Sequence, residues 1–519
     1  MQGKKQYSEK LFKQFQLSDR VPADNFYRRL KQVLDLHWLY KATRKYYGSE
    51  GQQSIDPIVF FKLMLIGYLE NLGSDRRIIS MVSLRLDMLF FIGYDIDEPL
   101  PWHSTLSRTR QLYGEELFKD FFRQILKQCI DKGMVAGRRQ VMDSVAVKAN
   151  AGMDSLIEKE ILDDAAVYAD ELKDEEEGKI NGDNDEDNNT TVSTARNKSV
   201  QLHHQWKAKA YKDMPRGNKE GQGHAKFVSN HTHYSTTDPD ARVSVKPGKP
   251  RQLNYLAQVS VDTAHHVITQ IQTDHADKKD SQCLPSLLQN TINNLQEEGL
   301  QIEEVFADAG YSSGKALKAL EENNITGYIP NFGQYKPSRE GFSYDKENDR
   351  YICSRGVHLP FKKLTTTSLG YKMKVYRSSS KDCGPCPLRS SCIGKSDFKK
   401  IDDSIDKPFY DRMHARLQSV NREKTRQLRS STVEPVLGTL VNYLAMRRVN
   451  TRGIKQASKC IIMAAVAYNL KKLLKWKQRK VETIVMARKK AEKCLSFYFF
   501  SLLHHLRPHS CVRPIFLLN

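Results

Sequence analysis

The sequence has no long apolar run. Its first residues, 1–6, contain no apolar signal core, and the apolar stretch 495–503 is too short to span a bilayer. We therefore expect a cytoplasmic protein without a membrane partner. The 519 residues are too many for one ordinary core and predict two or three domains with insertions.

Cysteine is also sparse. The nine cysteines are an odd number in a long chain, which argues against a secreted disulfide framework and for a reducing location. Four of them cluster, as Cys353, Cys383-Gly384-Pro385-Cys386 and Cys392. Two thiolates separated by two residues can bind one tetrahedral ion, so the four predict a structural zinc site. The alternative is four reduced cysteines in a small β insert, and a redox role is disfavoured because no thioredoxin-like unit surrounds them.

Acidic residues are outnumbered by basic ones. The chain has 82 Lys and Arg against 61 Asp and Glu, a net charge of +21. The imbalance is greatest over 421–480, where fifteen basic residues stand beside only Glu423 and Glu434. This excess predicts a polyanionic partner, with nucleic acid ahead of an anionic membrane.

Against this background, three acids occur in unusual settings. The short apolar run 140–147 predicts a buried strand, and Asp143 interrupts it. A buried carboxylate is costly unless a hydrogen bond, a basic side chain or a metal ion neutralises it. Asp308 follows a second apolar run, 305–307, and Glu434 stands at the expected start of an amphipathic helix. Together they suggest a metal site.

Residues 1–135 predict helices. Asp56-Pro57 begins one of them, with Asp as N-cap. Ile78, Val82 and Leu89 predict the next, and the segment 103–108 begins another, capped by Ser104 or Thr105. Periodicity favours neither a DNA-binding domain nor a plain structural bundle. The basic residues of interest on these helices are Arg76, Arg77, Arg108 and Arg110.

The segment 251–335 predicts a mixed α/β sheet whose first strands are antiparallel. Alternating residues over 253–261 indicate a strand, and a return strand follows the turn at 262–266. Asp262 is a rival acid, although an aspartate that opens a hairpin turn usually serves the turn. Helices and strands then alternate up to residue 330. The acidic run 170–189 within the preceding region predicts a solvated, disordered loop and no metal site.

The setting of Glu434 allows two interpretations. Val433, Leu437 and Leu440 lie on one helical face, and either Ser431 or Thr432 caps the helix. With Ser431 as cap, Glu434 would bond the cap amide. Pro435 favours Thr432, because proline then falls in the first turn and leaves Glu434 free to bind a hard cation. A second, largely apolar helix over 454–474 is expected to cover the sheet.

These strings, in this order, resemble the prokaryotic insertion-sequence transposases of the Asp-Asp-Glu (DDE) type. The similarity covers most of the chain, including the subgroup's four-cysteine insert. It rests on 54–57, 74–77 and 103–108 near the N-terminus, on Asp143 with 148–151, on 307–313, on 433–439, and on Asn469-Leu470. One departure is Val441, where the family often has a lysine that touches DNA.

The resemblance implies an RNase H-like mixed sheet as catalytic core, an all-α N-terminal domain and a small Cys-rich β insert. It implies a catalytic triad of Asp143, Asp308 and Glu434 that holds two Mg²⁺ or Mn²⁺ ions. The implied partner is double-stranded DNA, both element ends and target, bound by a homodimer or larger assembly in the nucleoid. The basic residues expected at that DNA are Arg429, Arg447, Arg448, Arg452, Lys455, Arg76, Arg77 and Arg108.

The expected units follow from these patterns. They are helices over 1–135, a catalytic core from 136–154 and 235–335, a charged and largely disordered insertion over 155–234, the four-cysteine insert over 336–405, core helices over 406–480, and a tail over 481–519. Two other functions share most of these features: a catalytically inactive DNA-binding relative, and a metal-dependent nuclease that cuts without joining.

Overall fold

The computed structural model describes residues 16–48, 50, 54–158, 230, 233–244, 251–331, 335, 337–367 and 371–476. Most of the expected insertion over 155–234 and the whole tail over 481–519 lie outside these residues. Every helix in the described part is too short or too polar to cross a membrane.

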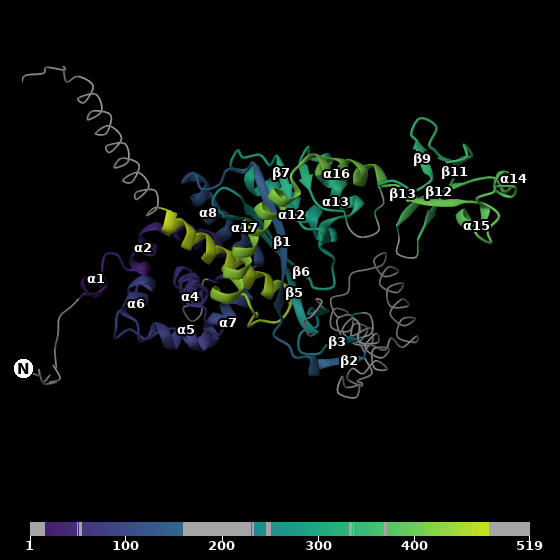
Figure 1. Cartoon of the computed structure of the whole chain (residues 1–519). Helices are drawn as coiled ribbons and strands as arrows, with labels where there is room; N and C mark the ends of the chain where they lie inside the picture. The colour runs from purple at the N-terminus through teal and green to yellow at the C-terminus, as the bar shows by residue number, and fades with distance from the viewer. Residues whose placement is uncertain are drawn as a thin grey trace, which may run out of the picture.

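The N-terminal region is helical, as predicted (Figure 1). Asp56 caps α4 (Pro57–Leu69), because its carboxylate accepts hydrogen bonds from the amides of Ile58 at 2.6 Å and Val59 at 3.3 Å. The helices are α1 (Leu17–Arg20), α2 (Phe26–Val33), α3 (Trp38–Thr43), α4 (Pro57–Leu69), α5 (Asp75–Val82), α6 (Leu86–Ile92), α7 (His103–Leu112) and α8 (Glu115–Asp131).

Two local predictions in this region were wrong. Ile78 and Leu89 lie on separate helices, α5 and α6, because the chain turns between them. The N-cap of α7 is Trp102 and neither Ser104 nor Thr105. Ser104 instead accepts a hydrogen bond from the Arg108 guanidinium at 2.9 Å, one helical turn along.

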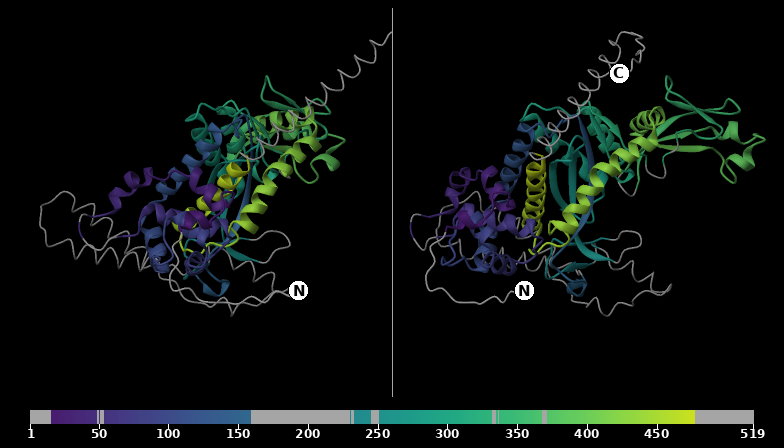
Figure 2. Two further views of the ribbon diagram at one scale, coloured as in Figure 1. Left: turned by 90° about the vertical axis from the view of Figure 1, so that its left-hand side faces the viewer. Right: turned by 60° about the vertical axis from the view of Figure 1, so that its left-hand side comes forward.

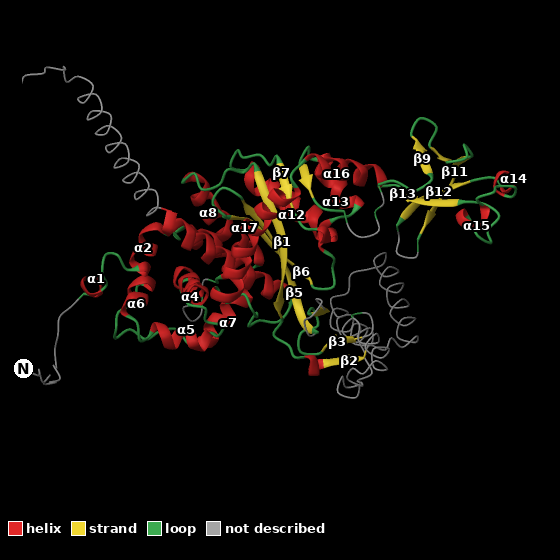
Figure 3. Cartoon of the chain, viewed as in Figure 1, coloured by secondary structure: helices red, strands yellow, loops and turns green. Residues whose placement is uncertain are grey.

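A mixed sheet forms the centre of the molecule, as predicted (Figure 3). Strand β5 pairs antiparallel with β1 and with β6, and this β5–β6 pair is the expected hairpin. Strands β7 and β8 continue the sheet in parallel with β1. The order is β4-β5-β1-β7-β8, with β6 also on β5; the strands are β1 (Arg139–Lys148), β4 (Arg242–Ser244), β5 (Gln252–Asp262), β6 (Ile268–His275), β7 (Glu304–Phe306) and β8 (Thr326–Tyr328).

Helices cover both faces of this sheet. On one face, α12 (Asp280–Gln296), α13 (Gly314–Glu322) and α16 (Lys407–Ser419) enclose a core that includes Met142 and Val305. On the other face lie α17 (Arg422–Tyr443), which runs along the sheet in Figure 2, and the helix over 454–476. The expected covering helix is thereby confirmed.

The N-terminal helices share the core of this second face. One continuous hydrophobic cluster includes Tyr27 of α2, Phe61 of α4, Val141 of β1 and Leu470. The expected boundary near residue 135 is therefore a change from helix to strand and not a gap in the core.

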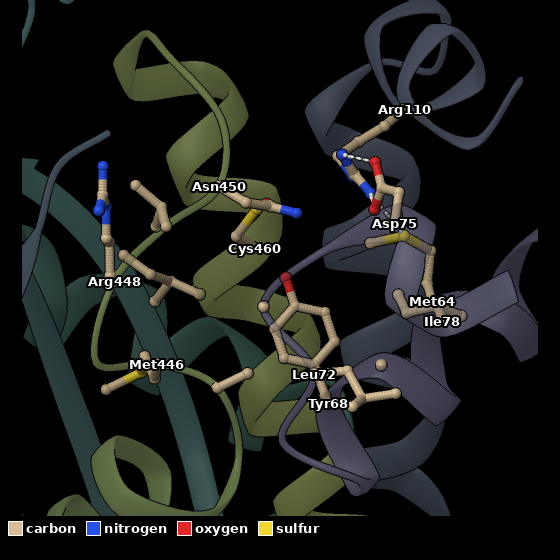
Figure 4. A pocket seen from close by; sticks show the side chains of 15 residues that line it. Met64, Tyr68, Leu72, Asp75, Ile78, Arg110, Met446, Arg448, Asn450 and Cys460 are labelled. Carbon is tan, nitrogen blue, oxygen red and sulfur yellow. Dashed lines mark hydrogen bonds and ion pairs between the residues drawn. The ribbon is translucent and has the colours of Figure 1, made fainter. Parts of the chain in front are cut away.

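Figure 4 shows a small pocket where the N-terminal helices meet the C-terminal segment. Arg110 lies here, 2% exposed, and its guanidinium pairs with Asp75 at 2.6 Å. The ammonium of Lys459, also buried, donates to the carbonyl of Arg110 at 2.8 Å. Arg110 is therefore a structural residue that joins the two parts, and it is inaccessible to DNA.

Helix α17 begins well before the predicted start. Its N-cap is Asn421, so Ser431 and Thr432 lie inside the helix and Glu434 lies near its middle. The residues 422–428 are mostly straight-chain helix formers, and Leu428 packs on the core. These contributions outweigh the cost of Pro435 within the helix.

The four-cysteine region is a separate five-stranded sheet that projects from the body in Figure 1. Its small core contains Tyr351, Leu359, Tyr376 and Ile401. The strands run in the order β13-β12-β11-β10-β9, and the elements are β9 (Phe342–Asp345), β10 (Arg350–Cys353), β11 (His358–Thr366), β12 (Lys372–Arg377), α14 (Ser380–Cys383), α15 (Arg389–Cys392) and β13 (Lys400–Ser404). A two-stranded sheet of β2 (Leu156–Glu158) and β3 (His233–Ser235) lies at the lower end of the body.

Asn469 fastens the helix over 454–476 to the sheet. Its side chain is fully buried, accepts from the amide of Ile268 at 3.0 Å and donates to the carbonyl of Ile268 at 2.9 Å. Ile268 begins β6, so a single amide side chain satisfies both backbone groups at this strand end.

We predict that Asn469→Ala lowers the free energy of unfolding by about 2–4 kcal/mol, because two buried backbone groups lose their partners. Urea denaturation measures this change. Gln289→Ala is the control, since Gln289 is exposed and bonds only to Asn293 of its own helix. A loss at Asn469 no larger than at Gln289 would contradict the role assigned to this amide.

Candidate active site

The strand register places two of the predicted acids side by side. Strands β1 and β7 are parallel neighbours, and Val141 pairs with Phe306. Asp143 and Asp308 each come two residues later, so both side chains leave the same face of the sheet at the same level. The sequence predicted both acids as site residues, but only this pairing brings them together.

Asp308 is held by the turn that follows β7. It caps the short 3₁₀ helix Ala309–Tyr311, and its carboxylate accepts from the amide of Gly310 at 2.9 Å. A Cβ atom on Gly310 would lie 3.0 Å from that carboxylate oxygen, so glycine suits this position. Tyr311 is buried and its hydroxyl donates to Gln258 of β5, which anchors the turn to the sheet.

Glu434 approaches the site from α17. It forms an ion pair with Arg429, whose Nη2 lies 3.9 Å from Glu434 Oε1 and whose Nη1 lies 3.1 Å from Asp143 Oδ2. The side chains of Asp143 and Arg429 are 15% and 24% exposed, and that of Glu434 is 58% exposed. The guanidinium of Arg429 therefore lies between the first and the third acid.

The three carboxylates are of the chemical type that binds a hard divalent cation, but they are not arranged as a group of ligands around one ion. Carboxylate oxygens are the usual ligands of Mg²⁺. Within the described residues, however, no three acidic, histidine or cysteine side chains are grouped so that they could hold a metal ion. Asp143 lies on β1 and Asp308 in the turn after the neighbouring β7, whereas Arg429 stands between Asp143 and Glu434.

The same finding applies to the predicted zinc site. Cys353 ends β10 within the sheet of the insert, whereas Cys383 and Cys392 end the two short helices α14 and α15. All four cysteines, Cys386 included, are partly exposed. No three of them are grouped so that they could hold a metal ion. The Cys-x-x-Cys spacing did not reveal where the fold places its partners, and the structure gives zinc no support.

Two polar residues beside the acids escaped the sequence analysis. Asp280 begins α12 and accepts a hydrogen bond from Gln258 at 2.8 Å. Gln258 also accepts the hydrogen bond from Tyr311. An acid in the first turn of a helix is ordinary, so no sequence signal singled it out. The rival acid Asp262 serves its turn, as predicted, by accepting from the amide of Ala264 at 2.9 Å.

A pocket of about 520 Å³ opens beside Asp308. Phe306 and Tyr328 stack at 4.7 Å on one part of its wall. Arg422, Arg426 and Arg429 line another part, at a spacing that puts them on one face of α17. Of these arginines, the sequence analysis singled out only Arg429.

The other predicted DNA-binding residues all lie on the surface. The segment after α17 is attached to the end of β1, because the Lys148 amide donates to the Arg447 carbonyl at 3.1 Å and the Arg448 guanidinium donates to Asn150 at 2.9 Å. The exposed residues are Arg76 and Arg77 on α5, Arg108 on α7, and Arg447, Arg448, Arg452 and Lys455.

A second basic pocket, of about 550 Å³, was missed by the sequence analysis. Lys471, Lys472 and Lys475 line it, together with Trp476, which packs on His265 with ring centroids 4.0 Å apart. Lysine beside aromatic rings is typical of nucleic-acid contacts.

Comparison with protein families gives three matches. A family described as "Transposase domain (DUF772)" matches residues 15–112. Two families, each described as "Transposase DDE domain", match residues 225–377 and 352–474. Asp308 and Glu434 fall within the matched segments, and Asp143 falls between them. No curated protein matches the chain.

Burial raises the pKa of Asp143 from 3.8 to about 6. The hydrogen bond from the Ser144 amide opposes this shift, the charge of Asp308 adds to it, and the charge of Arg429 opposes it. Below pH 3.8 the carboxyl is protonated in both the folded and the unfolded chain. As the pH rises towards 6, the unfolded chain loses the proton first, so ionisation favours unfolding.

We therefore predict that the Asp143→Asn variant gains stability relative to the wild type as the pH rises from 4 to 6. The gain should approach at most about 3 kcal/mol, and the two proteins should be alike near pH 4. Urea denaturation in EDTA across this range measures the difference. Parallel pH profiles for the two proteins would show that the Asp143 pKa is not raised.

Proposed function

The chain belongs to the DDE transposases of insertion sequences, and from this premise we propose that Asp143, Asp308 and Glu434 form its catalytic centre. It is a metal-dependent enzyme that acts on DNA. The observation that carries the proposal is the parallel register of β1 and β7, which sets Asp143 beside Asp308. Helix α17 crosses the same face of the sheet and brings Glu434 to it.

The reaction consists of in-line displacements at phosphorus, first by water and then by the freed 3′-OH. Asp143, Asp308 and Glu434 would hold the divalent ions, which would supply activation of the attacking oxygen and stabilisation of the leaving oxygen. The work left to the protein is to position the strand and to neutralise its phosphates. Rigid strands and a capped turn hold Asp143 and Asp308, and Arg422 and Arg426 line the pocket beside them.

We assign the DNA strand at the reacting phosphate to the 520 Å³ pocket. Its arginine row is cationic, and the stacked Phe306 and Tyr328 offer an apolar wall. The exposed arginines of α5 and α7 would contact the element ends, and cutting two ends together calls for at least a dimer. Such a protein would work in the cytoplasm of a prokaryote, at the nucleoid.

The catalytic assignment makes a direct prediction. Asp143→Ala, Asp308→Ala and Glu434→Ala each abolish strand cleavage and joining, because each removes a proposed ligand, and each still binds DNA. Gel assays with labelled element ends in Mg²⁺ measure cleavage and joining, and electrophoretic mobility shifts in EDTA measure binding.

Asp280→Asn is the matched control, since Asp280 is the fourth acid near Asp143. It should retain cleavage. An active Glu434→Ala together with an inactive Asp280→Asn would replace Glu434 by Asp280 as the third acid. If the wild type itself binds ends and never cuts them, the chain is an inactive relative, and cutting without joining would indicate a nuclease.

The pocket assignment makes a second prediction. Arg422→Gln and Arg426→Gln should each weaken DNA binding and reduce the slope of log K against log salt by about 1, because each variant releases one fewer counterion. Fluorescence anisotropy with a labelled duplex measures both quantities. Lys318→Gln on the exposed side of α13 removes the same charge and should leave the slope unchanged. Equal slopes in all variants would place the strand elsewhere.

A further inference from the structure

We propose that Arg429 is an internal cation that competes with divalent metal for the catalytic acids, and that DNA removes it. DNA binding would then raise the affinity of the centre for metal. The inference rests on the proposed catalytic role of Asp143 and Glu434. It extends that role by assigning a regulatory function to a residue that the sequence alone marks only as a DNA contact.

Arg429 lies between two of the proposed catalytic acids. Its two terminal nitrogens face different acids, with Nη1 at 3.1 Å from Asp143 and Nη2 at 3.9 Å from Glu434. The contact with Asp143 is largely shielded from solvent, because the two side chains are 15% and 24% exposed. Such a pair is stronger than an exposed ion pair, which is often worth little.

The guanidinium of Arg429 and a metal ion shared by Asp143 and Glu434 exclude each other. Mg²⁺ requires ligand oxygens at about 2.0–2.1 Å, so two carboxylates that share one ion bring their oxygens within roughly 4 Å of each other. Arg429 Nη1 donates a hydrogen bond to Asp143 Oδ2 at 3.1 Å, and its Nη2 lies 3.9 Å from Glu434 Oε1, so the guanidinium occupies the space between the two carboxylates. Its positive charge also repels an incoming cation.

A DNA phosphate would be an alternative partner for Arg429. The same side chain lines the 520 Å³ pocket, together with Arg426 and Asp308. A DNA phosphate in this pocket offers the guanidinium a two-pronged contact equal in kind to the one with a carboxylate. When Arg429 turns to the phosphate, the oxygens of Asp143 and Glu434 become available to metal. The enzyme would thus assemble its metal centre only when DNA occupies the pocket.

Thermodynamic linkage makes the coupling reciprocal. If DNA raises the metal affinity by a given factor, metal raises the DNA affinity by the same factor. Arg426 provides the matched control, because it lines the same pocket one helical turn away and forms no ion pair with the three acids among the described contacts.

The test is a titration of the full-length chain with Mn²⁺, in which electron paramagnetic resonance reports free Mn²⁺, with and without a saturating mixed-sequence DNA duplex. The wild type should bind Mn²⁺ about tenfold more tightly with the duplex, within the usual range of coupling between two sites. Arg429→Gln should bind Mn²⁺ without DNA as tightly as the wild type does with DNA, and should gain nothing further. Arg426→Gln should bind Mn²⁺ without DNA as tightly as the wild type does. Once the duplex saturates this variant, its Mn²⁺ affinity should rise by the same factor as that of the wild type.

Arg429→Lys is a second variant that retains the charge, and it should keep the weak, DNA-dependent Mn²⁺ affinity of the wild type. Thermal unfolding checks that each variant is folded. In the reciprocal experiment, Mn²⁺ should raise the duplex affinity of the wild type and leave that of Arg429→Gln unchanged. A wild-type affinity for Mn²⁺ that is indifferent to DNA, or one equal to that of Arg429→Gln without DNA, overturns the proposal.

Asp143→Asn separates the two proposals. If it loses Mn²⁺ binding with and without DNA while Arg429→Gln behaves as the wild type, the catalytic centre stands and the role of Arg429 falls. If Asp143→Asn binds Mn²⁺ as the wild type does, the proposed centre fails, and the inference about Arg429 fails with it.

Discussion

The pairing of β1 with β7 is the constraint on which the site depends. Two strands that are far apart in the sequence lie in parallel register, so that Asp143 and Asp308 leave one face at one level. A shift of the register by one residue would turn one of the two acids to the opposite face. That opposite face is closed by α12, α13 and α16 over Met142 and Val305, so the register is fixed by burial on both sides.

Two buried polar side chains of β5 support this arrangement because they find hydrogen-bond partners. The side of β5 that faces α12 contains Gln258 and Ser260, both fully buried. Gln258 joins Asp280 to Tyr311, and Ser260 belongs to a network with Gln140 and Thr269. Unsatisfied, such groups would destabilise the sheet, whereas satisfied they hold the turn of Asp308 in one position. The turn of Asp308 is therefore positioned partly through buried amide and hydroxyl side chains of the sheet.

The electrostatics of the site follow from the same burial. Asp143 interrupts a strand of apolar side chains, and the resulting desolvation disfavours its charged form. Arg429 supplies the compensating positive charge from α17, and Glu434 shares that charge at the rim. The centre proposed to accept metal cations is thus balanced by a cation of its own. In the proposed arrangement, the basic row of α17 would serve two partners, the acids on one side and DNA phosphates on the other.

The sequence alone determined the local features of this protein. These features depend on near neighbours, and the structure has them as predicted. They are an aspartate within an apolar strand, an aspartate that follows one, the Asp56-Pro57 helix start and the hairpin at Asp262. Tertiary structure decided what depends on distant partners. Arg429 and Asp143 are 286 positions apart, Asp280 becomes notable only beside Asp143, and no three of the four clustered cysteines are grouped so that they could hold an ion. Residue patterns report periodicity and turn chemistry, but ion pairs and ligand sets depend on how separate elements pack, which no local pattern contains.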